Sequence, residues 1–171
     1  ARLSAFRAQV LLAQEHFAKG LAQAQRAAEE AVEAQDRSTE ARAREALGVA
    51  KLSLGDPDCE GPLREALGIF QELGDVRSQG NIRGNLGVLT AITGRWNESV
   101  DWMRAAQADY VQSGNVIGAA FVGNNLGEML VKQGRLSEAE TILAEAKRVT
   151  RASGSEEWEA ATDLQLARAL K

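Results

Sequence analysis

The sequence predicts an all-α fold, a right-handed superhelical α-solenoid of antiparallel helix hairpins with about nine helices. One observation is a repeat, because three series of glycine-containing pairs recur at intervals of 39 or 40 residues. The series are Gly55-Asp56, Gly94-Arg95 and Gly134-Arg135; Gly74-Asp75, Gly114-Asn115 and Gly154-Ser155; and Leu47-Gly48, Leu86-Gly87 and Leu126-Gly127. The other is helical spacing of apolar residues, as in Val100, Met103 and Ala106. A period in this range is typical of solenoids, whose units bury their apolar faces against each other.

Each repeat is expected to be a helix, a tight glycine turn, a second helix and another glycine turn. Glycine suits these turns because it adopts positive φ after a helix C-terminus, and a following Asp or Asn can cap the next helix. The predicted helices are 2–14, 17–35, 38–54, 60–73, 76–93, 96–113, 116–133, 136–153 and 156–170. They form a single repeat domain, 1–171, with units at about 1–35, 38–74, 76–114 and 116–154 and a terminal helix. We expect this domain to be a fragment of a larger protein, because the chain opens and stops within helix-like segments.

Gly48, Gly87 and Gly127 are predicted to lie in the middle of helices, where each costs about 1 kcal/mol relative to Ala. Their recurrence at one position of the repeat indicates that the two helices of a hairpin approach closely there. Small residues recur at the matching position of the second helix, namely Gly20, Cys59, Ser99 and Ala139. We therefore expect Cys59 to be buried and unreactive, because apolar surroundings raise the pKa of a thiol.

The composition argues against nucleic-acid binding, membrane insertion and catalysis. The net charge is -4 with Lys and Arg spread evenly, so we expect no nucleic-acid partner. No apolar run approaches the ~20 residues that span a bilayer and no signal peptide is visible, so we expect a cytoplasmic protein without a membrane partner. Cys59 is the only cysteine and His16 the only histidine, so no metal or cofactor is expected. Without a paired acid and base, we expect no catalytic residue and interpret the chain as a non-enzyme.

The repeated residues resemble the tetratricopeptide repeat (TPR) family, whose pattern is W-x2-L-G-x2-Y, then A-x3-F, then P. The centre of this pattern is matched by Leu47-Gly48 with Cys59-x3-Leu63, by Leu86-Gly87 with Ser99-x3-Met103, and by Leu126-Gly127 with Ala139-x3-Leu143. The positions that differ are the Trp, held by Arg44, Arg83 and Gly123, and the Tyr, held by Lys51, Thr90 and Leu130. The terminal Pro is missing, and the period is about 40 residues instead of 34.

This long-repeat variant is similar to Leu-Gly-Asn repeat scaffolds, to kinesin light chains and to the sensor arrays of large bacterial regulators. The resemblance implies a protein- or peptide-binding module, the sensor or scaffold part of a larger bacterial regulatory protein. The Ala/Arg/Gly-rich composition is typical of GC-rich bacterial genomes. The alternative is a structural segment that self-associates as a homodimer through its open solenoid ends. Candidate apolar residues at one such end are Trp158, Leu164, Leu166 and Leu170.

Asn85 and Asn125 each precede a Leu-Gly pair on the first helix of a hairpin, the helix expected on the concave side. The resemblance implies that Asn in this context bonds the main chain of an extended peptide, since an amide both donates and accepts. The alternative is that each Asn bonds within the repeat and ties adjacent helices together. The residues predicted to line the concave peptide-binding face are Asn81, Arg83, Asn85, Val88, Phe121, Asn124, Asn125, Glu128 and Lys132. Their mixed charges favour a peptide over a polyanion.

Overall fold

The protein is described by a computed structural model, in which residues 1–153 and 156–170 have a defined backbone. The predicted turn at Gly154-Ser155 and the side chain of Trp158 lie outside the described residues. The chain divides into two compact units, residues 1–85 and 86–171, each with its own packing. The single-domain organisation expected from the sequence stays a prediction.

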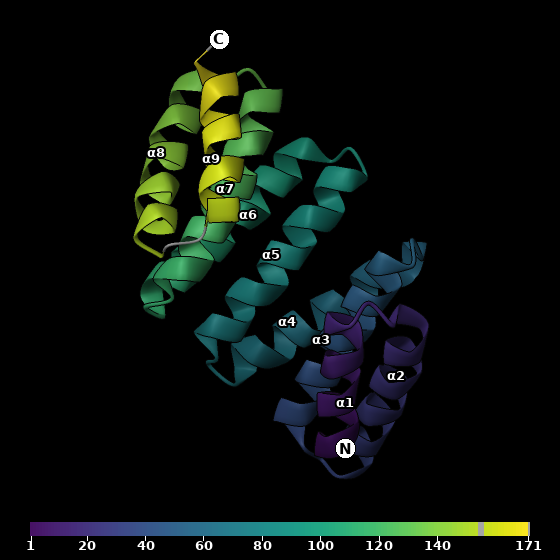
Figure 1. Ribbon diagram of the computed structural model, residues 1–171. Coiled ribbons are helices and arrows are strands. Elements are labelled where there is room, and N and C mark those ends of the chain that lie inside the picture. The colour runs from purple at the N-terminus through teal and green to yellow at the C-terminus, as the bar shows by residue number, and fades with distance from the viewer. Residues whose placement is uncertain (154–155, 171) are drawn as a thin grey trace. The chain divides into compact units, whose positions relative to one another are not determined.

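The described residues form helices and no strands, which confirms the all-α prediction (Figure 1). The helices are α1 (Arg2–Ala13), α2 (Phe17–Glu33), α3 (Arg37–Ser53), α4 (Glu60–Glu72), α5 (Val76–Ile92), α6 (Trp96–Gln112), α7 (Val116–Lys132), α8 (Leu136–Ser153) and α9 (Glu156–Ala169). A short 3-10 helix, η1 (Pro57–Cys59), precedes α4 and was missed by the sequence pattern. Most predicted helices ran one or two residues too far at the C-terminus, because the turn residues were counted as helical.

The turns between helices follow the predicted glycine chemistry. Their glycines have φ between 67° and 76°, at Gly55, Gly74, Gly94, Gly114 and Gly134. Two turns adopt the same left-handed conformation without glycine, at Glu15 (φ 59°) and Gln35 (φ 53°). The predicted caps are also present, since Asp75 Oδ1 accepts from the Ser78 amide and Asn115 Oδ1 from the Gly118 amide, each at 3.0 Å. The chain therefore reverses at each described turn by one shared backbone geometry.

In the first unit, the contact among α1, α2 and α3 is built mainly of alanine. Ala5, Ala27 and Ala43 form one buried cluster, and Ala8 and Ala24 belong to a second one nearby. Small side chains at these positions let α1, α2 and α3 approach closely, and Figure 1 shows the three helices packed side by side. This packing places α3 between α2 and α4.

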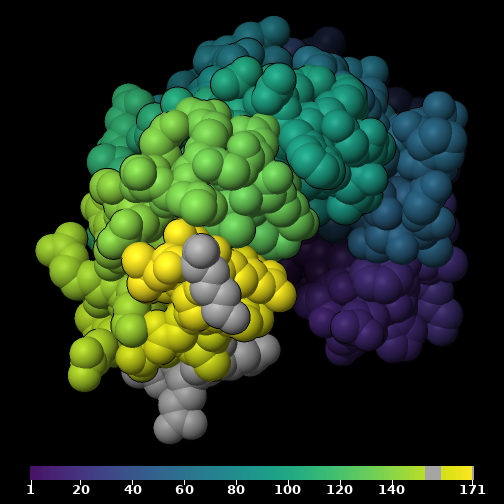
Figure 2. Space-filling model, turned by 90° about the horizontal axis from the view of Figure 1, so that it is seen from above, coloured from purple at the N-terminus to yellow at the C-terminus, as the bar shows by residue number. Residues whose placement is uncertain are grey.

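The second unit has a core of larger side chains. Leu126 and Leu130 of α7 pack with Leu143 of α8, and Ala169 of α9 joins the same cluster. Helices α8 and α9 lie side by side in Figure 1 and in the space-filling view of Figure 2. Of the terminal apolar residues, Leu166 packs against this core, whereas Leu164 and Leu170 are exposed.

The glycines inside helices sit where two helices meet, as predicted. An added Cβ would lie 2.6 Å from Leu63 Cγ at Gly48, 2.7 Å from Met103 Cγ at Gly87, and 2.4 Å from Leu143 Cγ at Gly127. In each hairpin the leucine or methionine of the second helix therefore occupies the place that the missing side chain leaves. Cys59 is buried in this region, which confirms the expectation from its position in the repeat.

Candidate functional site

One side of α7 carries five of the residues predicted to bind a peptide. Phe121, Asn124, Asn125, Glu128 and Lys132 follow the 3.6-residue period of the helix, so they share one side of it. We call this set the α7 face. Phe121 is 51% exposed, and Lys132 Nζ lies 2.8 Å from Glu128 Oε1. The fold thus brings an exposed aromatic ring, two amides and an ion pair together on one helix.

The two asparagines of the α7 face have unused hydrogen-bonding capacity. Asn124 Oδ1 is buried without a hydrogen-bond partner, and the half-buried Asn125 side chain makes no hydrogen bond within the described residues. The next two residues fix this arrangement, because Leu126 packs in the core and Gly127 rests against Leu143. A buried acceptor without a partner costs about 1–3 kcal/mol. A ligand N–H reaches the Asn124 carbonyl once that side chain turns towards the surface.

The remaining predicted residues lie on α5. Asn81 and Arg83 already interact with other parts of the protein. Asn85 is half-buried and makes no hydrogen bond in the described part of the chain, and Val88 is exposed. Asn85 belongs to the first unit and the α7 face to the second, so the single concave face expected from the sequence stays a prediction.

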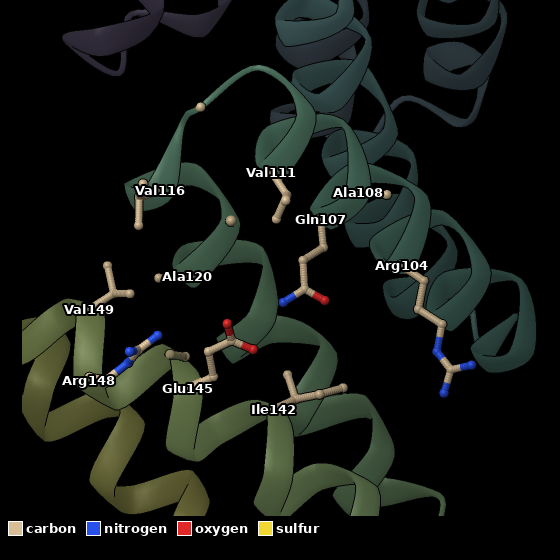
Figure 3. Close-up of a pocket in the computed structure, with 13 residues that line it drawn as sticks. Arg104, Gln107, Ala108, Val111, Val116, Ala120, Ile142, Glu145, Arg148 and Val149 are labelled. Atoms are coloured by element: carbon tan, nitrogen blue, oxygen red, sulfur yellow. The ribbon is translucent and has the colours of Figure 1, made fainter.

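A groove lies between α6 and α8 over α7, and the sequence did not predict it. Its volume is about 520 Å³. Figure 3 shows Gln107 of α6 and Glu145 of α8 extending into the space between the two helices, with Val111, Val116 and Val149 at one end. Gly123 of α7 lies beneath this lining, and an added Cβ there would meet Gln107 Nε2 at 3.1 Å and Ile142 Cγ2 at 3.6 Å. We call this cavity the α6–α8 groove.

The first unit holds a titratable group that sequence reasoning also missed. Glu45 of α3 lines a cavity of about 160 Å³ with Gln9, Leu12 and Val49. Burial raises the pKa of the Glu45 carboxyl to about 7, while the positive charge of Arg42 opposes the shift. The signal in the sequence was a glutamate at the repeat position that holds Gly in α5 and Asn in α7.

Two kinds of feature are absent from the described residues, a cluster of metal ligands and a helix that could cross a membrane. The described residues contain no group of three or more His, Cys, Asp or Glu side chains that could hold a metal ion. Over the same residues, every helix is too short or too polar to cross a bilayer. The pKa of the Cys59 thiol is raised by its burial, as expected for a packed cysteine.

The sequence model of the tetratricopeptide repeat family matches residues 123–153, which cover the second half of α7 and all of α8. Residues 123–153 thus match a tetratricopeptide repeat. Two solved structures of nearly identical TPR-like repeats from Podosopora anserina, attributed to a kinesin light chain, are similar to it with TM-scores of 0.78 and 0.77. Each is 14% identical to this chain, and the match covers 98% of this chain and 84% of the other. The likeness supports the all-α solenoid fold. No curated protein matches the sequence.

The α6–α8 groove adjoins the position that holds tryptophan in the tetratricopeptide pattern. Gly123 stands at that position, and α6 and α8 border the space that a side chain there would fill. The equivalent residue of the first unit is Arg44, whose guanidinium binds Glu65 of α4 and Glu40 of α3. The same location in this chain is therefore closed by charged side chains in one unit and bordered by a larger groove in the other.

Proposed function

We propose that this tetratricopeptide repeat chain is a peptide-binding module that uses the α7 face, as the sensor or scaffold part of a larger bacterial regulatory protein in the cytoplasm. The family fold typically mediates protein–protein interaction, which gives the general class of function. The observation that carries the proposal is the buried Asn124 Oδ1 without a partner beside the exposed Phe121 ring. A protein keeps an orphaned acceptor at a cost, and a bound main chain offsets that cost.

The chemistry of the α7 face fits a polypeptide. The amide of Asn125 can donate to and accept from a peptide unit, and Asn124 Oδ1 can accept from its N–H. Phe121 supplies apolar contact area, while Glu128 and Lys132 place both signs of charge at one end. Interfaces between proteins combine apolar contact with a polar rim in this way. Among the residues that the structure describes, Asn125 makes no hydrogen bond to the repeat, which supports ligand binding over a structural tie.

The test is a selection from a random linear dodecapeptide phage library on the wild-type chain, followed by affinity measurement with synthetic peptides. We expect Asn124→Ala/Asn125→Ala to weaken the selected peptides by 1–3 kcal/mol, or roughly 10- to 100-fold, with helical content unchanged. Asn97→Ala is the matched control, because this exposed amide lies on α6 and outside the α7 face. Asn85→Ala tests the predicted α5 position separately. Peptides that bind the double variant as well as the wild type would refute the assignment.

A second candidate is self-association through α9. Leu164 and Leu170 are exposed on this helix, and exposed apolar side chains promote association. Sedimentation at several protein concentrations separates the two functions. A concentration-independent monomer argues against self-association and leaves the peptide-binding proposal standing.

A further inference from the structure

The groove at this position of the repeat differs between the two units. Because the repeat aligns the two units, they can be compared residue by residue. Val116, Ala119 and Gly123 of α7 stand at the repeat positions of Arg37, Glu40 and Arg44 of α3. In the second helix of each hairpin, Glu145 of α8 stands at the position of Glu65 of α4. The charged residues of one unit are thus replaced by small or apolar residues on the floor of the α6–α8 groove.

In the first unit these charged residues close the groove. Arg44 binds the Glu65 carboxylate and also Glu40 at 2.9 Å, while Arg37 binds Glu40 at 2.9 Å and Glu72 at 2.5 Å. The cavity that remains there is about 260 Å³, half of the 520 Å³ of the α6–α8 groove. The carboxylate at the rim therefore has a guanidinium partner supplied by the same unit.

In the second unit the rim carboxylate lacks that partner. Glu145 is exposed, and the described residues provide no ion pair or hydrogen bond to it. Gln107, on the opposite wall, likewise makes no hydrogen bond there, and both side chains extend into the groove (Figure 3). Arg104 is occupied by Glu138 of α8 at 2.6 Å, and Figure 3 shows it directed away from Glu145. The Glu145 carboxylate and the Gln107 amide thus both face the groove, with Gln107 Nε2 next to Gly123.

We propose that the α6–α8 groove receives an arginine side chain from a partner polypeptide, with Glu145 as its counterion. The guanidinium takes the place that Arg44 fills in the first unit, and the Gln107 carbonyl accepts a second hydrogen bond from its planar fork. The arginine methylenes lie over Gly123, where the added Cβ of any residue would meet only a movable amide at 3.1 Å and ordinary contacts from Ile142 and Ala146. Long charged side chains bury their stems on apolar surface in this manner.

The apolar end of the groove sets the neighbours of that arginine. Val111 and Val116 are 68% and 59% exposed, and with Val149 they line the part of the cavity beyond Gln107. Apolar residues flanking the arginine cover these valines, which a free guanidinium compound or an inorganic cation cannot do. The net charge of -4 on the chain also favours a basic partner segment over an acidic one.

This site is independent of the α7 face. Gly123 and Asn125 are two residues apart. A rotation of about 100° per residue about the helix axis therefore puts them on opposite sides of α7. A variant of Glu145 leaves Asn124 and Asn125 unchanged, and the reverse also holds. Failure of one site therefore does not imply failure of the other.

The test uses acetyl-Leu-Arg-Leu-amide as the probe and the 171-residue chain labelled with ¹⁵N. We expect amide shifts at Ala119, Gly123 and Glu145 on titration, and an affinity roughly 10- to 100-fold lower for Glu145→Gln. The citrulline analogue, which is isosteric but uncharged, should lose affinity to a similar extent. Glu140→Gln on the exposed side of α8 is the control and should bind like the wild type.

Two further variants test the sign of the ligand's charge and reproduce the closed groove of the first unit. Arg148→Gln removes a cation from the rim, so it should bind the probe as tightly as the wild type or more tightly. Ala119→Glu/Gly123→Arg installs the closed groove of the first unit and should abolish binding. If this double variant does not fold, the Glu145 and citrulline comparisons still decide.

Three results would overturn the proposal. Equal binding of the citrulline analogue would remove the guanidinium from the argument. Loss of probe binding in Arg148→Gln would mean that Arg148 holds the peptide and that Glu145 is not the counterion of the probe's guanidinium. Concentration-dependent shifts at Gly123 without any probe would mean that a second copy of this chain covers the groove.

Discussion

Replacing two glycines of α7 by alanine should change stability in opposite directions. Gly123 and Gly127 are one helical turn apart, so both alanines gain about 1 kcal/mol of helix propensity. At Gly127 the new Cβ would lie 2.4 Å from both Cγ and Cδ2 of Leu143, a fully buried side chain. Overpacking of this kind costs about 1–3 kcal/mol. Gly127→Ala should therefore destabilise the chain by up to about 2 kcal/mol, because the clash outweighs the gain.

Gly123→Ala meets only the end of a flexible side chain. The nearest atom is Gln107 Nε2 at 3.1 Å, and the amide can turn away into the groove. The propensity gain is then retained, so this variant should be more stable by about 0.5–1 kcal/mol. Urea unfolding followed by circular dichroism measures both values, provided that the m-value is unchanged.

A double-mutant cycle tests the stated cause of the difference. Leu143→Ala alone should cost about 2–5 kcal/mol because it leaves a cavity. Combined with Gly127→Ala it should cost less than the sum by at least about 1 kcal/mol, since the new methyl group enters that cavity. Equal stabilities of the two glycine variants, or additivity in the cycle, would refute the close-approach explanation.

Three further predictions concern single residues of the first unit. Cys59 should react with a thiol reagent roughly 100-fold more slowly in the native chain than in urea, because burial raises its pKa and blocks access; rapid native labelling would contradict its packing. The pKa of Glu45 is raised to about 7 from 4.5, so the folded state binds its proton more tightly. Its stabilising contribution is complete below pH 4.5 and lost as the pH rises through 7, so Glu45→Gln should remove about 1–3 kcal/mol of the pH dependence measured by urea unfolding between pH 5 and 8. Gln35→Gly should stabilise the chain by about 0.5–1 kcal/mol, because φ of 53° strains a non-glycine residue. Ala34→Gly, at a residue with φ of -82°, is its control and should destabilise.

The helices and turns could be predicted because each recurring glycine has a conformational or packing cause. A turn that needs positive φ favours glycine, and a close contact between two helices favours it as well. The sequence therefore contains two kinds of recurring glycine series. The turns at Glu15 and Gln35 show the limit of this logic, because tertiary packing holds two ordinary residues in the same conformation. The pattern could place those turns only by alignment with their neighbours.

The candidate site was predictable only in part. Helical spacing brought Phe121, Asn124 and Asn125 to one side of α7, because that depends on the helix alone. The α6–α8 groove was not predicted, since it depends on the side chain that Gly123 lacks and on the distance between two other helices. The raised pKa of Glu45 has the same origin, because its burial comes from packing that no local pattern encodes.

The alanine-rich contact among α1, α2 and α3 restricts which substitutions that part of the chain can accept during evolution. Ala8, Ala24, Ala27, Ala41 and Ala43 are fully buried, and each already has a single methyl group. Most single-base changes from alanine codons lead to larger or charged residues, which would push the helices apart. In the second unit a buried leucine can lose a methyl group and leave only a small void. Inherited variation should therefore accumulate unequally, with α6–α8 diverging faster between related proteins than α1–α3.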